Sequence, residues 1–334
     1  MINSSLGDMA LAYSQRQRNV SIRQDITRLS TELASGQVSD ARQVLKGNYN
    51  YLADLERKMA DLSSFKVATS EAAHFSDAMQ TSLSDLNDIG TKTASTLLTA
   101  SSGDTGPHVA EAAREARGAL EAMIGRFNTQ TAGRHLFSGD ATDTPPLPDV
   151  DTFLTALKTA IAGAATPDDM LADAKTWFDD PAGFAATLYG GSGTGMSPMS
   201  LSRHEKVSLD IKATDPELRE VLRITALAAL TEDPAFGLTG QQKLELYGKT
   251  GQQLLFAQDD IIAVQSRIGF AEARIEEVTS RNAAEMTSLE FARNKLLAID
   301  PYETATRLEE VQFQLESLYS VTVKLSRLNL VNFL

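Results

Sequence analysis

The chain has 334 residues, enough for two or three domains, and 42% of them are hydrophobic, which excludes an intrinsically disordered protein on composition. Its net charge of −13 argues against nucleic acid or an anionic membrane as its main partner. The sequence contains no cysteine, so disulfides, zinc–thiolate sites and thiol nucleophiles are excluded together.

The opening stretch, MINSSLGDMALAYSQRQRN, has neither the basic nor the apolar region of a cleavable secretory signal. No part of the chain offers the ~20 apolar residues that a membrane-spanning helix needs. We therefore expect no cleaved signal peptide and no membrane span.

Residues 22–36, IRQDITRLSTELASG, predict an amphipathic helix with a narrow apolar stripe. The apolar residues recur at steps of three and four, and Gly36 supplies a helix stop. Such a stripe needs a partner, because alone it leaves apolar surface in water. Its members are Ile22, Ile26, Leu29 and Leu33.

The inner segments repeat the pattern and predict long helices. One helix opens at Leu52 and runs to the breaking sequence SSGDTGPH at 101–108, and a second follows to Phe127. Towards the C-terminus a single heptad frame gives a rod seam, interrupted in its middle by Asn282 and Glu285. Buried polar residues there would fix the register, whereas the alternative is a locally solvated seam. The apolar members of the rod seam are Ile261, Ile268, Ile275, Val278, Leu289 and Leu296.

Residues 138–216 differ in character from the helical arms. They hold seven of the ten prolines and carry five basic against twelve acidic residues, a charge of −7. Residues 151–164 and 168–178 predict two short amphipathic helices, and EKVSLDIKA at 205–213 alternates like a strand. We expect a small α+β insertion domain with a core of its own.

The final segment, residues 302–334, predicts one long helix after a break at Pro301. Its apolar stripe is the first candidate partner for the stripe at residues 22–33. The two stripes together form the predicted self-assembly seam. The C-terminal members are Leu308, Val311, Leu315, Leu318, Val321, Leu325 and Leu328.

The predicted fold is mainly α, a long coiled-coil-like helical rod built from the N- and C-terminal arms with the small α+β insertion. We predict three domains. They are a terminal helical pair (1–40 with 300–334, disordered in the monomer), a rod (41–137 with 217–299) and the outer insertion (138–216).

No catalytic, metal or cofactor site is predicted. The loop GGSGTGMS at 190–197 has phosphate-loop glycine spacing, but Met196 stands where the phosphate-binding lysine belongs, which favours a flexible surface loop. The four histidines lack the spacing of metal ligands on one helix face. We therefore expect a protein that is not an enzyme.

Four stretches resemble the flagellin superfamily. They are RLSTELASGQVSDARQ at 28–43, AGRHLFSGDATDTPPL at 132–147, IDPYETATRLEEVQFQLESLYSV at 299–321 and LNLVNFL at 328–334. The proline-rich continuation of the second stretch favours the hook-associated proteins of the hook–filament junction over filament flagellins, although Leu147 stands where that group often has Phe.

This resemblance implies an extracellular structural subunit of the bacterial flagellum. It implies a homo-oligomer in a ring or helix, contacts with another hook-associated protein and with flagellin, and type III export without a cleaved signal. An export chaperone would hold the C-terminal helix beforehand. The alternatives are a flagellin filament subunit and, more remotely, an intracellular coiled-coil scaffold that forms a soluble dimer and is not secreted.

Overall fold

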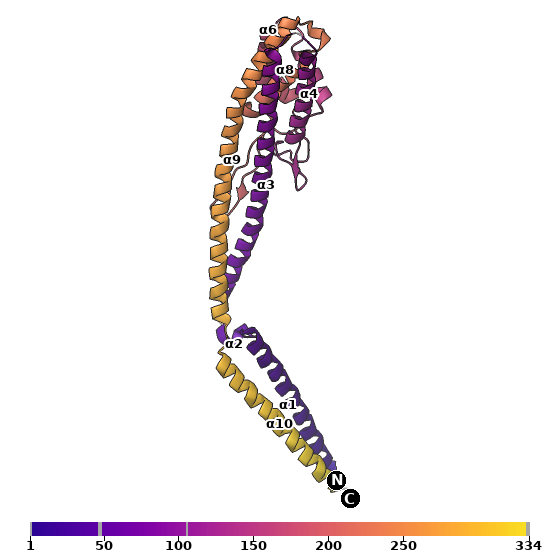
Figure 1. Ribbon diagram of the computed structural model, residues 1–334. Helices are drawn as coiled ribbons and strands as arrows, with labels where there is room; N and C mark the ends of the chain where they lie inside the picture. The colour runs from indigo at the N-terminus through magenta and orange to yellow at the C-terminus, as the bar shows by residue number, and fades with distance from the viewer. Residues whose placement is uncertain (1, 46–48, 105, 332–334) are drawn as a thin grey trace. The chain divides into compact units, whose positions relative to one another are not determined.

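The computed structural model describes residues 2–45, 49–104 and 106–331, without the side chains of residues 2–8, 11, 12, 43, 44 and 325–331. The chain is mainly α-helical, with long helices in its N- and C-terminal arms, which confirms the predicted fold class. It divides into two compact units, unit 1 comprising residues 1–62 with 284–334 and unit 2 comprising residues 63–283 (Figure 1).

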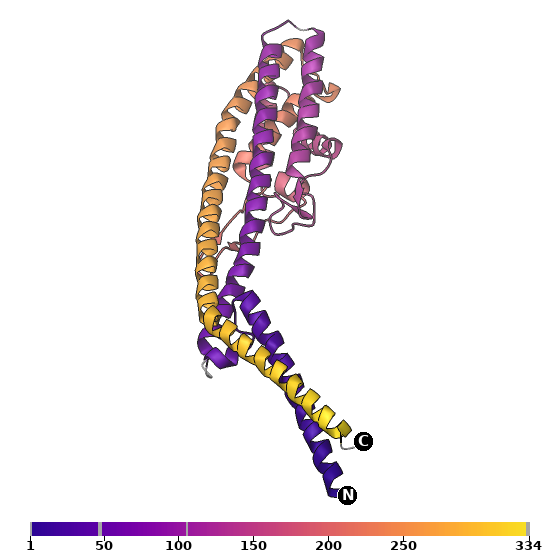
Figure 2. The ribbon, with the colours of Figure 1, turned by 60° about the horizontal axis from the view of Figure 1, so that its bottom comes forward.

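Unit 1 is built around a pair of helices from the two ends of the chain. Helix α1 (Ile2–Ser35) and helix α10 (Pro301–Val331) lie side by side and run in opposite directions (Figures 1 and 2). Unit 1 also contains α2 (Ala41–Leu45), the beginning of α3 (Asn50–Ser101) and the end of α9 (Gly240–Leu297).

The two predicted helix breaks of unit 1 are confirmed. Gly36 follows α1 with a left-handed backbone (φ +70°), which a residue without a Cβ adopts at little cost. Pro301 opens α10, where its missing N–H would have no helical partner. The Asp300 carboxylate accepts hydrogen bonds from the Tyr302 and Glu303 N–H groups at 2.9 and 3.0 Å and so caps the helix.

In unit 2, α3 and α9 pack along each other, and α4 (Pro107–Phe127) packs beside them with α8 (Pro216–Leu230) (Figures 1 and 2). Gly251 on α9 allows the closest approach, because a Cβ there would lie 2.9 Å from the Leu98 side chain. The predicted break at 101–108 is confirmed by the gap between α3 and α4.

The segment between α4 and α8 contains short elements. Strands β1 (Gln130–Thr131) and β2 (Arg134–His135) pair antiparallel, as do β3 (Met199–Ser200) and β4 (Lys206–Val207). The two predicted amphipathic helices appear as α5 (Val150–Ala160) and α6 (Pro167–Asp179), each with a capped N-terminus. The remaining elements are α7 (Phe184–Thr187) and a 3₁₀ turn, η1 (Pro234–Phe236).

Two expectations for this segment need correction. One continuous cluster of buried apolar side chains joins its residues, such as Phe153 and Leu209, to Phe75 of α3 and Ile261 of α9, so it has no separate core. The expected strand at 205–213 shrinks to Lys206–Val207, because its hairpin partner β3 is equally short. The three-domain division itself stays a prediction.

Candidate self-assembly site

The apolar stripes of α1 and α10 meet in unit 1. On α1, Leu29 is buried, Ile22 and Ile26 are half-buried and Leu33 is 39% exposed. A long-range hydrogen bond supports the pairing, since the Arg23 guanidinium donates to the Tyr319 hydroxyl at 2.8 Å. This bond lowers the pKa of the Tyr319 hydroxyl below its ordinary value.

The α10 stripe is covered only in part. Four of its members are half-buried and Val321 is 48% exposed, while the side chains of Leu325 and Leu328 lie outside the described residues. Two helices thus leave much of their own seam accessible, and its role in assembly stays a prediction. The half-buried members are Leu308, Val311, Leu315 and Leu318.

The two helix breaks are joined to each other by backbone hydrogen bonds. The Val38 N–H donates to the Leu297 carbonyl at 2.9 Å, and the Ile299 N–H donates to the Gly36 carbonyl at 3.1 Å. The Gln37 side-chain amide also donates to the Asn294 side chain at 3.0 Å. This joint, which spacing alone did not reveal, fixes the segment that follows α1 to the end of α9 and to the short connection between α9 and α10.

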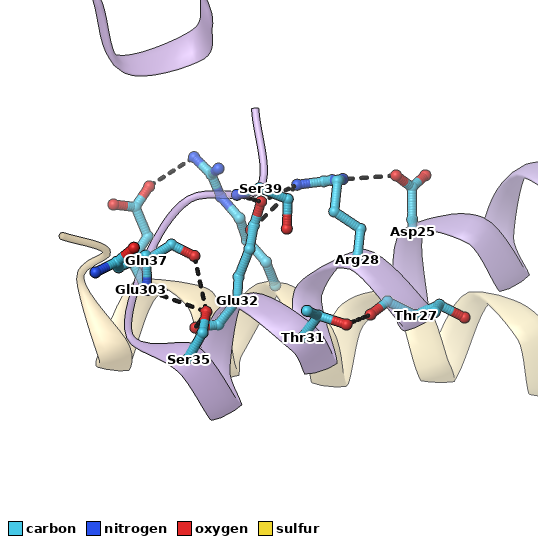
Figure 3. Close-up of polar contacts among 10 residues, drawn as sticks. Asp25, Thr27, Arg28, Thr31, Glu32, Ser35, Gln37, Ser39 and Glu303 are labelled. Atoms are coloured by element: carbon cyan, nitrogen blue, oxygen red, sulfur yellow. Dashed lines mark hydrogen bonds and ion pairs between the residues drawn. The ribbon is translucent and has the colours of Figure 1, made fainter. Parts of the chain in front are cut away.

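A buried carboxylate secures the same joint (Figure 3). Glu32 is 5% exposed; it accepts a hydrogen bond from the Ser39 N–H at 3.0 Å and pairs with Arg28 at 3.3 Å. Hydrogen bonding to Asp25, with the nearby charge of Glu32, raises the pKa of Arg28 above its ordinary value. Glu32 lies off the apolar stripe of α1, and only its place one turn before Gly36 could have singled it out in the sequence.

The rod seam is buried in unit 2 and partly open in unit 1. Leu289 and Leu296, which belong to unit 1, are half-buried. At the interruption Asn282 is buried and donates to the Leu201 carbonyl at 2.9 Å, whereas Glu285 is exposed. The seam is therefore solvated at Glu285, whereas a role of buried Asn282 in fixing the register stays a prediction. The buried seam members are Ile261, Ile268, Ile275 and Val278.

The Asn282 contact belongs to a clasp that holds the β3–β4 hairpin on α9. Glu205, in the hairpin turn, pairs with Arg274 at 3.2 Å and with Arg281 at 2.6 Å. Asn282 thus binds a hairpin that is distant in sequence. Its burial in the seam is explained by this bond without a register contact between helices.

The glycine-rich loop at 190–197 lies at the surface, as expected, since none of its residues is buried, and backbone hydrogen bonds join it to the preceding segment. The Gly190 N–H donates to the Pro146 carbonyl at 3.0 Å and the Ser192 N–H donates to the Ser138 carbonyl at 2.8 Å. A Cβ on Gly195 would overlap the Asp210 carboxylate, so the glycine serves close packing.

Two searches for other kinds of site gave negative results. Within the part of the chain that the structure describes, no cluster of three or more histidines and carboxylates is placed to hold a metal ion. The helices described here include none that is apolar over a length sufficient to cross a membrane.

The paired terminal helices of unit 1 and the long helices of unit 2 define a mainly α-helical class of protein. Residues 256–334 match the family model of the bacterial flagellin C-terminal helical region. No curated protein matches the chain.

Two solved structures share the fold over most of the chain. A flagellar hook-associated protein from Vibrio parahaemolyticus is 12% identical, with a TM-score of 0.50, over 73% of this chain and 95% of that one. FlgL from Bacillus cereus is 11% identical, with a TM-score of 0.52, over 72% of this chain and 98% of that one. The family model supports the resemblance to the flagellin superfamily over residues 256–334, and the two solved structures show that the fold is shared.

Proposed function

We propose that the chain is a structural subunit of the bacterial flagellum that joins hook to filament. The observation that carries the proposal is the terminal pair in unit 1, whose two stripes cover each other only in part and so require neighbouring molecules. The flagellin C-terminal region and the fold of FlgL support the same function. Both related groups are structural proteins, which supports a protein that is not an enzyme.

The proposed partners follow from this role. The subunit would bind copies of itself, another hook-associated protein on one side and flagellin on the other. It would leave the cell by type III export without a cleaved signal and stay in the extracellular flagellum. Before export a chaperone would cover the apolar stripe of α10, because such a stripe exposed in the cytoplasm favours aggregation.

The test is to locate the protein with a labelled antibody on intact cells and to remove it by gene deletion. The proposal expects a narrow band between hook and filament, and cells without the protein should release their filaments into the medium. A uniformly cytoplasmic signal would refute the proposal and favour the coiled-coil scaffold.

The flagellin match at residues 256–334 also supports a second candidate, a filament subunit. Copy number separates the two, because a filament subunit labels the whole filament whereas a junction subunit labels a thin ring. Labelling along the entire filament would replace the junction assignment and leave the flagellar assignment in place.

A further inference from the structure

Helix α9 has an apolar face that is directed away from the core of unit 2. Phe256 and Phe270 are 73% and 79% exposed. Leu255 and Ile262 belong to the same face and are 43% and 49% exposed. The face lies on the part of α9 that belongs to unit 2, where the opposite side of the helix packs on α3 (Figures 1 and 2). Apolar surface of this extent usually marks a contact with another molecule.

This face of α9 is centred on Ala263. Phe256 and Phe270 lie seven residues before and seven residues after Ala263, so the three residues follow one line along the helix. The two aromatic side chains are about 21 Å apart along the helix axis. Ala263 is exposed and has a small side chain, so a second helix can approach most closely at the centre of the face.

The charges beside this face are also arranged about Ala263. Asp259 and Asp260 lie four and three residues before it, and Arg267 lies four residues after it. Both aspartates are exposed, and within the described part of the chain neither pairs with a cation. Arg267 contacts Glu217 at 3.2 Å through one of its nitrogens, and its side chain is 55% exposed, so it keeps N–H groups for another carboxylate. The face is therefore acidic before its centre and basic after it.

We propose that this face of α9 binds the same face of α9 in a second copy of the chain, with the two helices antiparallel. Phe256 of each copy then packs beside Phe270 of the other copy, and Ala263 lies at the two-fold axis. Asp260 of each copy meets Arg267 of the other, since the two residues lie at almost equal distances on opposite sides of Ala263 and on the same edge of the face.

Charge complementarity determines both the partner and the orientation. In a parallel contact of this face with itself, Asp260 would lie against Asp260 and Arg267 against Arg267, and like charges repel. Turning one helix end for end brings opposite charges together and still places an aromatic side chain against another aromatic side chain. The two halves of the face complement each other, so the partner that fits it is a second copy of this chain.

The antiparallel contact is closed, because it uses the same surface on both copies and leaves none for a third. Subunits of a ring or a helical polymer all point the same way along the axis of the assembly. The antiparallel dimer is therefore a form of the free chain, and it must separate before either copy joins such a polymer. Only this last consequence rests on the proposed function, whereas the contact itself does not.

The test is chemical cross-linking at the two-fold axis in the full-length chain. The sequence contains no cysteine, so Ala263→Cys introduces a single thiol. A short bismaleimide joins two such thiols where they lie close together. The yield of covalent dimer on a denaturing gel, measured over a range of protein concentrations, therefore reports this contact separately from any other association. Ser84→Cys, at an exposed position of α3, is the matched control and should give little covalent dimer.

Charge reversal in the Ala263→Cys chain tests the orientation. Asp260→Arg alone, or Arg267→Asp alone, should raise the concentration for half-maximal cross-linking by about tenfold, because the two opposite-charge pairs of the dimer become like-charge pairs. An equimolar mixture of the two variants should cross-link as the unreversed chain does, because each altered residue then meets its complement. The chain with both substitutions should also recover. Asp88→Arg, at an exposed position of α3, carries the same charge change as Asp260→Arg and should leave the yield unchanged.

Several results would overturn the inference. They are a yield from Ala263→Cys no higher than that from Ser84→Cys, single reversals that leave the yield unchanged, and a mixture that does not recover. An equal loss of yield with Asp88→Arg would also overturn it, because the effect would then follow from net charge. Circular dichroism of each variant checks that the helices are intact. The antibody location tests the proposed function without reference to this contact, so the two can fail separately.

Discussion

Ile268 is 2% exposed in the core that α3 and α9 share, and a charge placed there would have no partner. We expect Ile268→Arg to lower the free energy of unfolding by about 3–5 kcal/mol, because an unpaired buried charge is poorly solvated. Thermal melting followed by circular dichroism measures the loss. Ala273→Arg, on the exposed side of the same helix, should melt as the wild type does. Equal melting temperatures for both variants would mean that the heptad frame is wrong.

A second substitution tests the buried side-chain amide of Asn282. Asn282→Ala leaves the Leu201 carbonyl without its donor, which should cost about 1–3 kcal/mol. Hydrogen exchange should then speed up at the Leu201 and Ser202 amides, which donate within the hairpin to the Glu205 carbonyl. Glu285→Ala, at the exposed seam position, is the control. Unchanged exchange in the Asn282 variant would show that the clasp is not needed to hold the hairpin.

Sequence spacing could predict the burial of residues such as Ile261 and Ile275, because a heptad frame is a local property of one helix. It could not supply the partner of Asn282, which lies 81 residues away, nor the bond between Ser39 and Glu32. Partners of that kind depend on how loops return to the helices. The apolar stripes of α1 and α10 could therefore be predicted from the sequence, whereas the hydrogen-bonded joint between residues 36–38 and 297–299 could not.

At the scale of the element, helix ends were predictable wherever glycine or proline sets them. Gly36, the 101–108 break and Pro301 all mark helix boundaries, because each acts on the backbone locally. The three apolar residues of the alternation at 205–213, Val207, Leu209 and Ile211, are all buried. It could not predict the length of the strand, because strand length depends on a partner that the local pattern does not identify.

Asp215, directly before α8, is expected to make the stability of the fold depend on pH. Burial raises the pKa of the Asp215 carboxyl above its ordinary value, although the Lys212 N–H and ammonium oppose the effect. The folded state thus favours the protonated form, so this residue's contribution to stability falls as the pH rises from the ordinary pKa through the raised one. In Asp215→Asn that decline should be absent. Urea unfolding between pH 4 and 7 should show the free energy of unfolding of the variant rising relative to that of the wild type as the pH increases. Parallel pH profiles for the two proteins would contradict this prediction.

The partial burial of α1 and α10 predicts that these two helices are the first part of the monomer to be cut by a protease. Their stripes are mostly half-buried, and helices depend on tertiary packing for most of their stability. We expect limited proteolysis of the monomer to cut both helices first and leave about residues 40–300, because few apolar contacts hold them. Mass spectrometry of the fragments gives the boundaries. Protection of residues 10–30 in a verified monomer would count against this prediction.

For the whole molecule, the two ends of the chain meet in the terminal helix pair of unit 1, and the apolar stripes form the inner faces of that pair. The inner faces hold α1 and α10 together through Leu29, Leu315 and the Arg23–Tyr319 bond. On the opposite sides of the two helices, Val20 of α1 is 55% exposed and Phe313 of α10 is 70% exposed. Heptad spacing revealed only the inner faces, because exposed aromatic residues a few turns apart give no periodic signal until the helix pair is assembled.

The α10 stripe predicts that chaperone binding and assembly depend on the same residues. A chaperone that covers the α10 stripe competes with α1 for Leu315 and Leu318, so Leu315→Asp with Leu318→Asp should weaken both chaperone binding and assembly. A buried Leu contributes roughly 1.5–3 kcal/mol, so the loss of two should reduce chaperone affinity by at least tenfold. Glu309→Arg with Glu316→Arg, at exposed positions off the stripe, is the control and should leave the chaperone affinity unchanged. Calorimetry with the purified chaperone and filament retention in cells measure the two effects. Undiminished chaperone affinity after deletion of residues 302–334 would show that the chaperone binds another segment of the chain.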